Sequence, residues 1–263
     1  MEIKIKTTTL LFAFLFLQLF NYRCSGKQDV QESINNNPVR IYPKIVSVIP
    51  HDSSAFTQGL FYNDGKLYES TGLYNQSSLR ILDTNGTILR KIDVPQIFAE
   101  GITLFENNLY QLTWKSQFAI IYSFPDLTSK GTVSYQGEGW GLTGNNSSLI
   151  MSNGSDTLYF MNPGFEITNR VAVTCNGTPL ENLNELEYAE NSVYANVWYS
   201  DYIFEISHET GIVSRIIDCS QIVAQEKPKS KESVLNGIAY IPSANLFYIT
   251  GKNWKHIYLI KIT

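Results

Sequence analysis

The sequence predicts an all-β chain, a five-bladed β-propeller, from two columns of repeated residues. In the first column a polar or aromatic residue opens a short strand, usually followed by Gly and then Leu or Ile: Gln58-Gly-Leu, Glu100-Gly-Ile, Trp140-Gly-Leu, Asn184-Glu-Leu and Asn236-Gly-Ile. Their first residues are spaced 42, 40, 44 and 52 positions apart. The second column starts eleven residues later in four repeats and thirteen later in the fifth, at Glu69, Gln111, Met151, Ala195 and Ile249. Repeats of this length made of short strands are typical of propeller blades, which bury their faces against neighbouring blades.

Each repeat is predicted to contain four antiparallel strands. In the first blade they are expected at about 56–63, 66–72, 78–83 and 87–94, with Asn63-Asp-Gly and Asn85-Gly as hairpin turns. The next three blades are expected over 98–135, 138–174 and 182–218. No stretch keeps a helical apolar period over three turns, so helices are expected to be minor.

The last repeat lacks a strand. After Asn236–Tyr240 and Leu246–Gly251 only His256–Ile262 remains, and the apolar segment Arg40–Ile49 is predicted to supply the fourth strand. Such a closure leaves no open sheet edge. Residues 39–263 then form the propeller, and the charged stretch 220–233, which lengthens the fourth spacing, is expected to be a mobile loop.

The composition supports a globular domain with a sizeable core. Apolar residues make up 43% of the 263 residues and aromatic residues 13%. The formal net charge of −4 and the lack of a basic block give no support for nucleic-acid binding.

The N-terminal residues resemble an export signal, predicted over residues 1–24. Lys4 and Lys6 precede an apolar run from Leu10 to Phe20 that is too short to span a bilayer. No clean small-residue cleavage site follows this run, and the residues before Cys24 are a poor match to a lipidation signal. The sequence therefore leaves open whether the signal is cleaved or Cys24 is lipidated. The chain is therefore expected to be exported, as a periplasmic, lipid-anchored or secreted protein, with residues 25–38 as a flexible tether.

Two cysteines remain after the predicted signal, Cys175 and Cys219. A disulfide is permitted in an exported protein. They lie at corresponding ends of consecutive repeats, where the outer strands of adjacent blades diverge. Both are expected to be unpaired.

The two columns also predict a site. The innermost strands of a propeller line its axis, and their ends meet at one mouth of the channel. The leading residues and the ends of the second column place amides, indoles, one carboxylate and one ammonium there: Gln58, Glu100, Trp114, Trp140, Asn184, Trp198, Asn236 and Lys252. Charged residues are rarely buried without a partner, which favours a functional site, although a structural Glu100–Lys252 ion pair and tryptophans used for packing are the alternatives.

Other candidates are weaker. Glu69, Glu138 and Glu185 lie near the same rim, whereas Glu187 is expected to point elsewhere. The three histidines, His51, His208 and His256, have no metal-ligand spacing and are expected on the surface. No phosphate-binding loop and no nucleophile elbow is present.

Taken in order, the repeat motifs over residues 40–263 resemble those of the plant and bacterial type of glutaminyl-peptide cyclotransferase, a family of five-bladed propellers. The segments that carry the resemblance are Phe56-Thr-Gln-Gly-Leu, Glu69-Ser-Thr-Gly-Leu-Tyr with Ser78-Leu-Arg, Glu100-Gly-Ile-Thr-Leu, Gln111-Leu-Thr-Trp, Glu138-Gly-Trp-Gly-Leu-Thr, Leu183-Asn-Glu-Leu-Glu-Tyr, Ala195-Asn-Val-Trp, Leu235-Asn-Gly-Ile-Ala-Tyr and Thr250-Gly-Lys-Asn-Trp. One departure is Ala99, since a Gly often precedes the Glu in this family.

The resemblance implies that an N-terminal Gln of a peptide or protein is cyclised to pyroglutamate with release of ammonia, without a catalytic metal or other cofactor. Glu100 is then the general acid and base. Lys252, Asn184 and Gln58 orient the amide and stabilise its oxyanion. Phe56, Trp114, Trp140 and Trp198 form the walls of the substrate pocket.

Two other functions fit the same residues. A non-catalytic propeller could bind a peptide or glycan at the aromatic rim. A glycoside-cleaving enzyme would pair Glu100 with Glu69 or Glu138. The sequence leaves open whether a structural Ca²⁺ occupies the channel, and a monomer is the default expectation.

Overall fold

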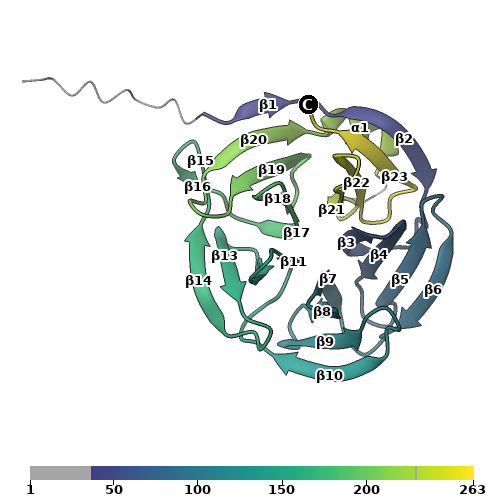
Figure 1. Cartoon of the computed structure of the whole chain (residues 1–263). Helices are drawn as coiled ribbons and strands as arrows, with labels where there is room; N and C mark the ends of the chain where they lie inside the picture. The colour runs from purple at the N-terminus through teal and green to yellow at the C-terminus, as the bar shows by residue number, and fades with distance from the viewer. Residues whose placement is uncertain (1–36, 229) are drawn as a thin grey trace, which may run out of the picture. The chain divides into compact units, whose positions relative to one another are not determined.

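The computed structural model describes residues 37–228 and 230–263. Five sheets, each built on four antiparallel strands, stand around a central axis, and the predicted five-bladed β-propeller is confirmed (Figure 1). The predicted export signal and most of the predicted tether lie outside the described residues. No helix in the described ranges is long and apolar enough to cross a membrane.

The first two blades follow the predicted strand order. Blade 1 consists of β3 (Thr57–Asn63), β4 (Lys66–Thr71), β5 (Ser78–Asp83) and β6 (Ile88–Asp93). Blade 2 consists of β7 (Ala99–Phe105), β8 (Asn108–Thr113), β9 (Phe118–Ser123) and β10 (Ser129–Ser134). In both blades the first strand is innermost.

Blades 3 and 4 repeat the arrangement. Blade 3 consists of β11 (Leu142–Gly144), β12 (Leu149–Met151), β13 (Thr157–Met161) and β14 (Ile167–Ala172). Blade 4 consists of β17 (Leu183–Ala189), β18 (Ser192–Val197), β19 (Tyr202–Ser207) and β20 (Val213–Asp218). A short hairpin of β15 (Thr174–Cys175) and β16 (Thr178–Pro179) connects them.

Blade 5 is closed by the N-terminal segment, as predicted. It contains β21 (Leu235–Ile241), β22 (Leu246–Gly251), β23 (His256–Lys261) and, antiparallel to β23, β2 (Lys44–Pro50). The predicted single strand is split, however. β1 (Val39–Ile41) pairs in parallel with β20 of blade 4, and the chain crosses to blade 5 at Pro43, which has no N–H to donate to a ladder. The segment therefore ties two blades together.

The expectation of a mobile loop over 220–233 was wrong for its first half. Ser220–Glu226 form α1, which buries Ile222 and Val223 against the core of blades 4 and 5. The helix ends at Lys227, whose backbone is left-handed. Seven residues are too few to show a helical period in the sequence, and burial in the folded protein stabilises the short helix.

The core lies between adjacent blades. One cluster joins Leu60 and Leu67 of blade 1 to Ala239 and Tyr248 of blade 5. Other clusters join the remaining neighbours in the same way. Each blade thus buries its faces against the next, which is the packing that the repeat predicts.

The glycines of the first column permit this close packing near the axis. A Cβ on Gly59 would lie 2.7 Å from the backbone nitrogen of Ile102 in the next blade. A Cβ on Gly101 would overlap the backbone of Leu142. The inner strands therefore approach one another without an intervening side chain, and the flanking residues of the column face the channel mouth.

Within the described ranges Cys175, which is partly buried, and Cys219, which is buried, are both free, so the prediction that these two cysteines are unpaired is confirmed. The expectation of three surface histidines was wrong for His51, which is buried. Its Nε2 pairs with Glu69 Oε1 at 2.8 Å, and its Nδ1 lies 3.0 Å from the backbone oxygen of Trp254 in blade 5. This contact joins blade 1 to blade 5.

Candidate active site

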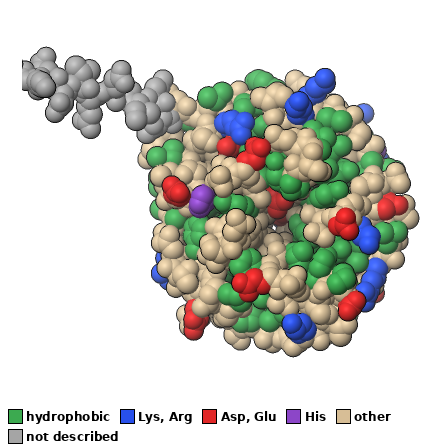
Figure 2. Space-filling model, in the orientation of Figure 1, with side chains coloured by type: hydrophobic (Ala, Val, Ile, Leu, Met, Phe, Trp, Pro, Cys, Tyr) green, Lys and Arg blue, Asp and Glu red, His purple; other side chains and the backbone are tan. Residues whose placement is uncertain are grey.

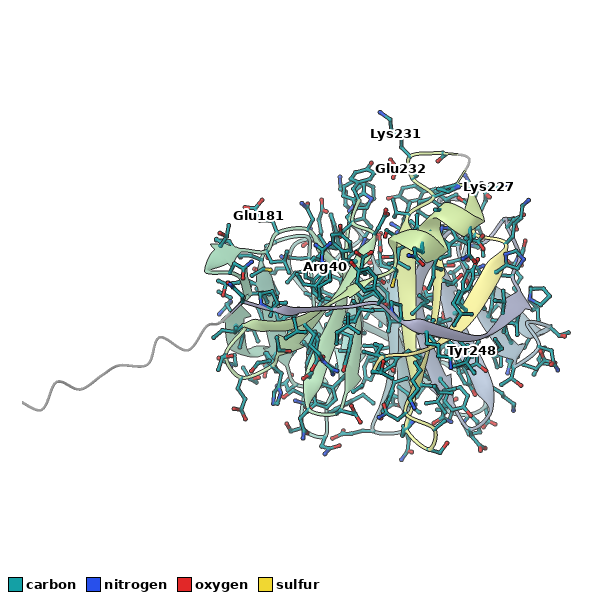
Figure 3. The ribbon with its side chains drawn as sticks, turned by 90° about the horizontal axis from the view of Figure 1, so that it is seen from above. Arg40, Glu181, Lys227, Lys231, Glu232 and Tyr248 are labelled. Atoms are coloured by element: carbon teal, nitrogen blue, oxygen red, sulfur yellow. The ribbon has the colours of Figure 1, made fainter. Side chains whose placement is uncertain are left out.

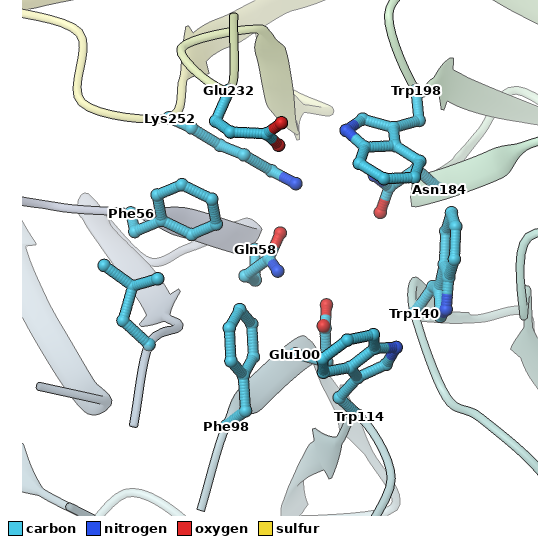
Figure 4. A pocket seen from close by; sticks show the side chains of 11 residues that line it. Phe56, Gln58, Phe98, Glu100, Trp114, Trp140, Asn184, Trp198, Glu232 and Lys252 are labelled. Carbon is cyan, nitrogen blue, oxygen red and sulfur yellow. The ribbon is translucent and has the colours of Figure 1, made fainter. Parts of the chain in front are cut away.

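A cavity of about 380 Å³ opens at one mouth of the central channel (Figure 4). Its lining contains all eight residues to which the resemblance assigns a role, together with three that were not predicted: Phe56, Gln58, Leu73, Phe98, Glu100, Trp114, Trp140, Asn184, Trp198, Glu232 and Lys252. The blades follow one another clockwise in Figure 1 and anticlockwise in Figure 4, so Figure 2, which is drawn in the orientation of Figure 1, shows the opposite face of the ring, with a small hollow at its centre.

The lining residues come from equivalent places in the blades. Gln58, Glu100 and Asn184 lie near the starts of the inner strands β3, β7 and β17. Trp114, Trp198 and Lys252 directly follow the second strands β8, β18 and β22. Because equivalent strand ends converge on the axis, residues far apart in the sequence meet here.

Two of the missed residues had a signal in the repeat. Phe98 stands two residues before Glu100, as Phe56 stands two before Gln58. Leu73 directly follows the end of the second column in blade 1. Glu232 had none, because it lies in the insertion between α1 and β21, outside the repeat.

Asn236 does not line the cavity, although it belongs to the first column. It is fully buried, and its Nδ2 donates to the Thr57 backbone oxygen at 2.9 Å and to Gln58 Oε1 at 3.3 Å. Asn236 therefore positions the side chain of Gln58 from outside the cavity lining.

Glu100 is the buried acid of the cavity, with 4% of its surface exposed. Burial raises the pKa of its carboxyl well above the usual range. The Lys252 ammonium opposes this shift, and the Glu138 carboxylate adds to it. Glu100 thus has a strong affinity for a proton.

Lys252 is equally buried, and burial lowers the pKa of its ammonium to about 8 against the opposing effect of Glu100 and Glu232. Its Nζ lies 5.0 Å from the ring centroid of Phe56 and 6.0 Å from that of Trp198, in cation–π geometry. Glu100 and Lys252 interact through space, but no salt bridge joins these two described residues. A structural ion pair is therefore not what holds them in the pocket.

Two polar groups of the lining lack a partner. Trp198 Nε1 and Asn184 Oδ1 are buried and make no hydrogen bond within the described structure. Buried polar atoms are almost always paired. One free donor and one free acceptor in a single cavity match a ligand that both accepts and donates hydrogen bonds.

The other two indoles are already bonded. Trp114 Nε1 and Trp140 Nε1 donate to the same oxygen of Glu138, at 2.7 and 3.0 Å. Burial raises the pKa of Glu138, but the bonds from Trp140 and Trp114 and the nearby Lys115 ammonium outweigh it and hold the pKa below its usual value. Glu138 thus remains a carboxylate that fixes two walls of the cavity from outside.

The other carboxylates considered from the sequence lie elsewhere. Glu69 is bound to His51 and accepts from Thr57 Oγ1 at 2.7 Å, away from the cavity lining. Glu185 of blade 4 accepts from the backbone N–H of Leu60 in blade 1, which is not an adjacent blade, whereas Glu187 accepts from that of Tyr240 in the adjacent blade 5. A glycoside-cleaving pair of Glu100 with Glu69 is therefore not formed.

No group of three or more His, Cys, Asp or Glu side chains in the described part of the chain is arranged to hold a metal ion.

The fold and the cavity define a propeller with a candidate active site, in which a proton-binding carboxyl and an ammonium lie among aromatic walls. Residues 16–262 match the family model of glutamine cyclotransferase. The chain is 38% identical over 261 residues to the glutaminyl-peptide cyclotransferase of Arabidopsis thaliana, covering 95% of this chain and 79% of that protein. The crystal structure of Myxococcus xanthus glutaminyl cyclase superposes with a TM-score of 0.82 and 37% identity, covering 86% of this chain and 98% of that one. The chain belongs to the glutamine cyclotransferase family and is an enzyme.

Proposed function

We propose that this enzyme converts the N-terminal Gln of peptides or proteins to pyroglutamate and releases ammonia, with Glu100 as general acid and base. The observation that carries the proposal is the buried Glu100 carboxyl in a cavity that also holds an unpaired donor and an unpaired acceptor. The names of the similar proteins support the same substrate class.

Positioning is the first task of the site. The α-amine must reach the side-chain amide carbon of the same residue, so the Gln must fold back on itself. A cavity of about 380 Å³ lies at the small end of ligand pockets and suits a single terminal residue. The aromatic walls hold the residue in the folded shape and exclude water, which brings the reacting atoms together.

Proton transfer is the second task. As the amine nitrogen bonds to the amide carbon, the Glu100 carboxylate accepts a proton from that nitrogen. The resulting carboxylic acid then protonates the amide nitrogen, whose bond to carbon breaks as ammonia leaves. A carboxyl with a raised pKa is a stronger base than an exposed one and suits both transfers.

Charge stabilisation is the third task. The amide oxygen becomes negative in the tetrahedral intermediate, and Trp198 Nε1 and the Lys252 ammonium are the donors available to it. Asn184 Oδ1 accepts from the amide NH₂ and so fixes which way the amide faces. The mechanism assigns no step to a metal or cofactor.

The test is ammonia release from a peptide with an N-terminal Gln, followed by mass spectrometry. The same peptide with an acetylated N-terminus serves as the substrate control, since it lacks the nucleophile. Glu100→Gln keeps the shape of the side chain and is expected to lose about 100- to 10,000-fold in kcat. Glu166→Gln removes an exposed carboxylate outside the cavity and is expected to keep wild-type turnover.

Near-normal turnover by Glu100→Gln would remove Glu100 from this role. Binding of the peptide by the wild-type chain without ammonia release would instead favour a binding propeller.

We also propose that the chain acts outside the cytoplasm, on the basis of the signal-like residues 1–24. Finding the full-length chain in the cytoplasmic fraction would contradict this.

A further inference from the structure

Two residues from different parts of the chain meet at the mouth of the cavity. Tyr199 follows β18 and stacks on Trp198, with ring centroids 4.5 Å apart and planes 19° apart. Its hydroxyl donates a hydrogen bond of 2.5 Å to Glu232 Oε1. Glu232 itself lines the cavity. Tyr199 therefore connects Trp198 of the cavity wall to the exposed carboxylate of Glu232.

The segment that carries Glu232 is tied to blade 5 on both sides. Before it, the buried Glu226 at the end of α1 accepts a hydrogen bond of 2.6 Å from Tyr258. After it, the Ser233 backbone oxygen accepts a bond of 3.1 Å from Trp254 Nε1. Glu232 is thus held at the mouth by contacts that do not involve its own side chain.

The ionisable groups of the lining occupy two depths. Glu100 and Lys252 are buried, whereas Glu232 is exposed. The neighbouring Lys231 projects from the tip of the segment, away from the propeller, while Glu232 lies below it (Figure 3). At the mouth, Glu138 is offset by Lys115, whose Nζ lies 3.6 Å from it. Glu232 is also a carboxylate at the mouth, but no exposed cation among the described lining residues pairs with it.

In the proposed reaction the first residue reacts beside Glu100, so the rest of the peptide leaves through the mouth. We propose that Glu232, oriented by Tyr199, forms a subsite for the second residue of the peptide, favouring a cationic side chain and disfavouring an acidic one. This inference rests on the proposed function and adds a substrate preference to it.

The test uses three peptides that differ only in the second residue, which is Lys, Ala or Glu. At low ionic strength the wild-type kcat/KM is expected to fall in that order, with a ratio of roughly three- to tenfold between the Lys and Glu peptides, as expected for one exposed charge acting on both. High salt is expected to compress the ratio. Glu232→Gln is expected to bring the ratio close to one, and Tyr199→Phe to reduce it while keeping the stack on Trp198.

The ratio, measured within each variant, separates recognition from a structural effect, since a damaged pocket slows all three peptides alike. Glu181→Gln is the matched control, because Glu181 is an exposed carboxylate on the same face outside the cavity lining (Figure 3). It is expected to keep the wild-type ratio. A wild-type ratio near one, or a full ratio in Glu232→Gln, would overturn the subsite while turnover of the Ala peptide upholds the cyclase function. No turnover of any of the three peptides would overturn both.

Discussion

The indole rings of Trp140 and Trp198 meet edge to face, with centroids 5.5 Å apart and planes 87° apart. The two residues differ in one respect. Trp140 donates its N–H to Glu138, whereas the N–H of Trp198 has no partner among the residues that the structure describes. One ring is therefore a fixed wall, and the other combines a wall with an unpaired donor.

This difference predicts unequal effects of two matched substitutions. Trp198→Phe keeps an aromatic wall but removes the free donor, and is expected to lower kcat about 100-fold or more, as loss of an oxyanion donor does. Trp140→Phe removes an N–H that is already bonded outside the cavity, and is expected to cost less. Steady-state kinetics on a Gln-initiated peptide measure both, and an equal or larger loss in Trp140→Phe would contradict the assignment.

The Lys252 ammonium predicts an alkaline limit to activity. Its pKa lies at about 8, so the positive charge is lost as the pH rises through that value. If the charge stabilises the oxyanion, kcat/KM falls above about pH 8. Lys252→Arg keeps its charge at much higher pH, so the alkaline limb is expected to move upward even though the maximal rate is lower. An unmoved limb would assign that titration to another group.

The His51–Glu69 pair predicts a stability effect away from the site. Both side chains are fully buried, with 0% exposed. Removing one partner leaves the other buried without its pair, so His51→Ala is expected to lower the free energy of unfolding by about 3–5 kcal/mol. His256→Ala is the control, since His256 pairs with Glu226 but has 45% of its side chain exposed. It is expected to cost about 1 kcal/mol or less.

The same pair sets the pH range of this stabilisation. Burial lowers the pKa of His51, but Glu69 more than reverses this shift, so the pKa is raised in the folded protein. The stabilisation is therefore complete below about pH 6.5 and is lost as the pH rises through the pKa of His51 in the folded state. Burial raises the pKa of Glu69, but His51 and Arg80 outweigh it. The stabilisation contributed by the Glu69 carboxylate is present above about pH 4.3 and is lost as the pH falls through the lowered pKa of the folded state. Urea unfolding should show the largest difference between wild type and His51→Ala between these values; a difference independent of pH would contradict the pair.

Much of the fold and site was predictable because the repeat is in the sequence. Residues at the same column occupy equivalent places in each blade, so the spacing alone predicts that Gln58, Glu100 and Asn184 lie at one mouth. The closing strand was expected because an incomplete last blade requires one.

Other features had no local pattern. The short helix α1 and the pairing of β1 with β20 depend on burial against other blades. His51 is isolated in the sequence, yet it lies beside Glu69 and Trp254, which come from two blades. Glu232 lies in an insertion, and only its anchored segment brings it to the cavity.

The sequence by itself determined the blade number, the order of the strands and most of the side chains that line the cavity, because a periodic chain places equivalent residues at equivalent positions. The tertiary structure alone decided which of those side chains are already bonded. Glu138 accepts hydrogen bonds from the indoles of Trp114 and Trp140, whereas that of Trp198 is unpaired within the described part of the chain. Hydrogen-bond partnership depends on distances and directions between blades, which no spacing along one chain specifies.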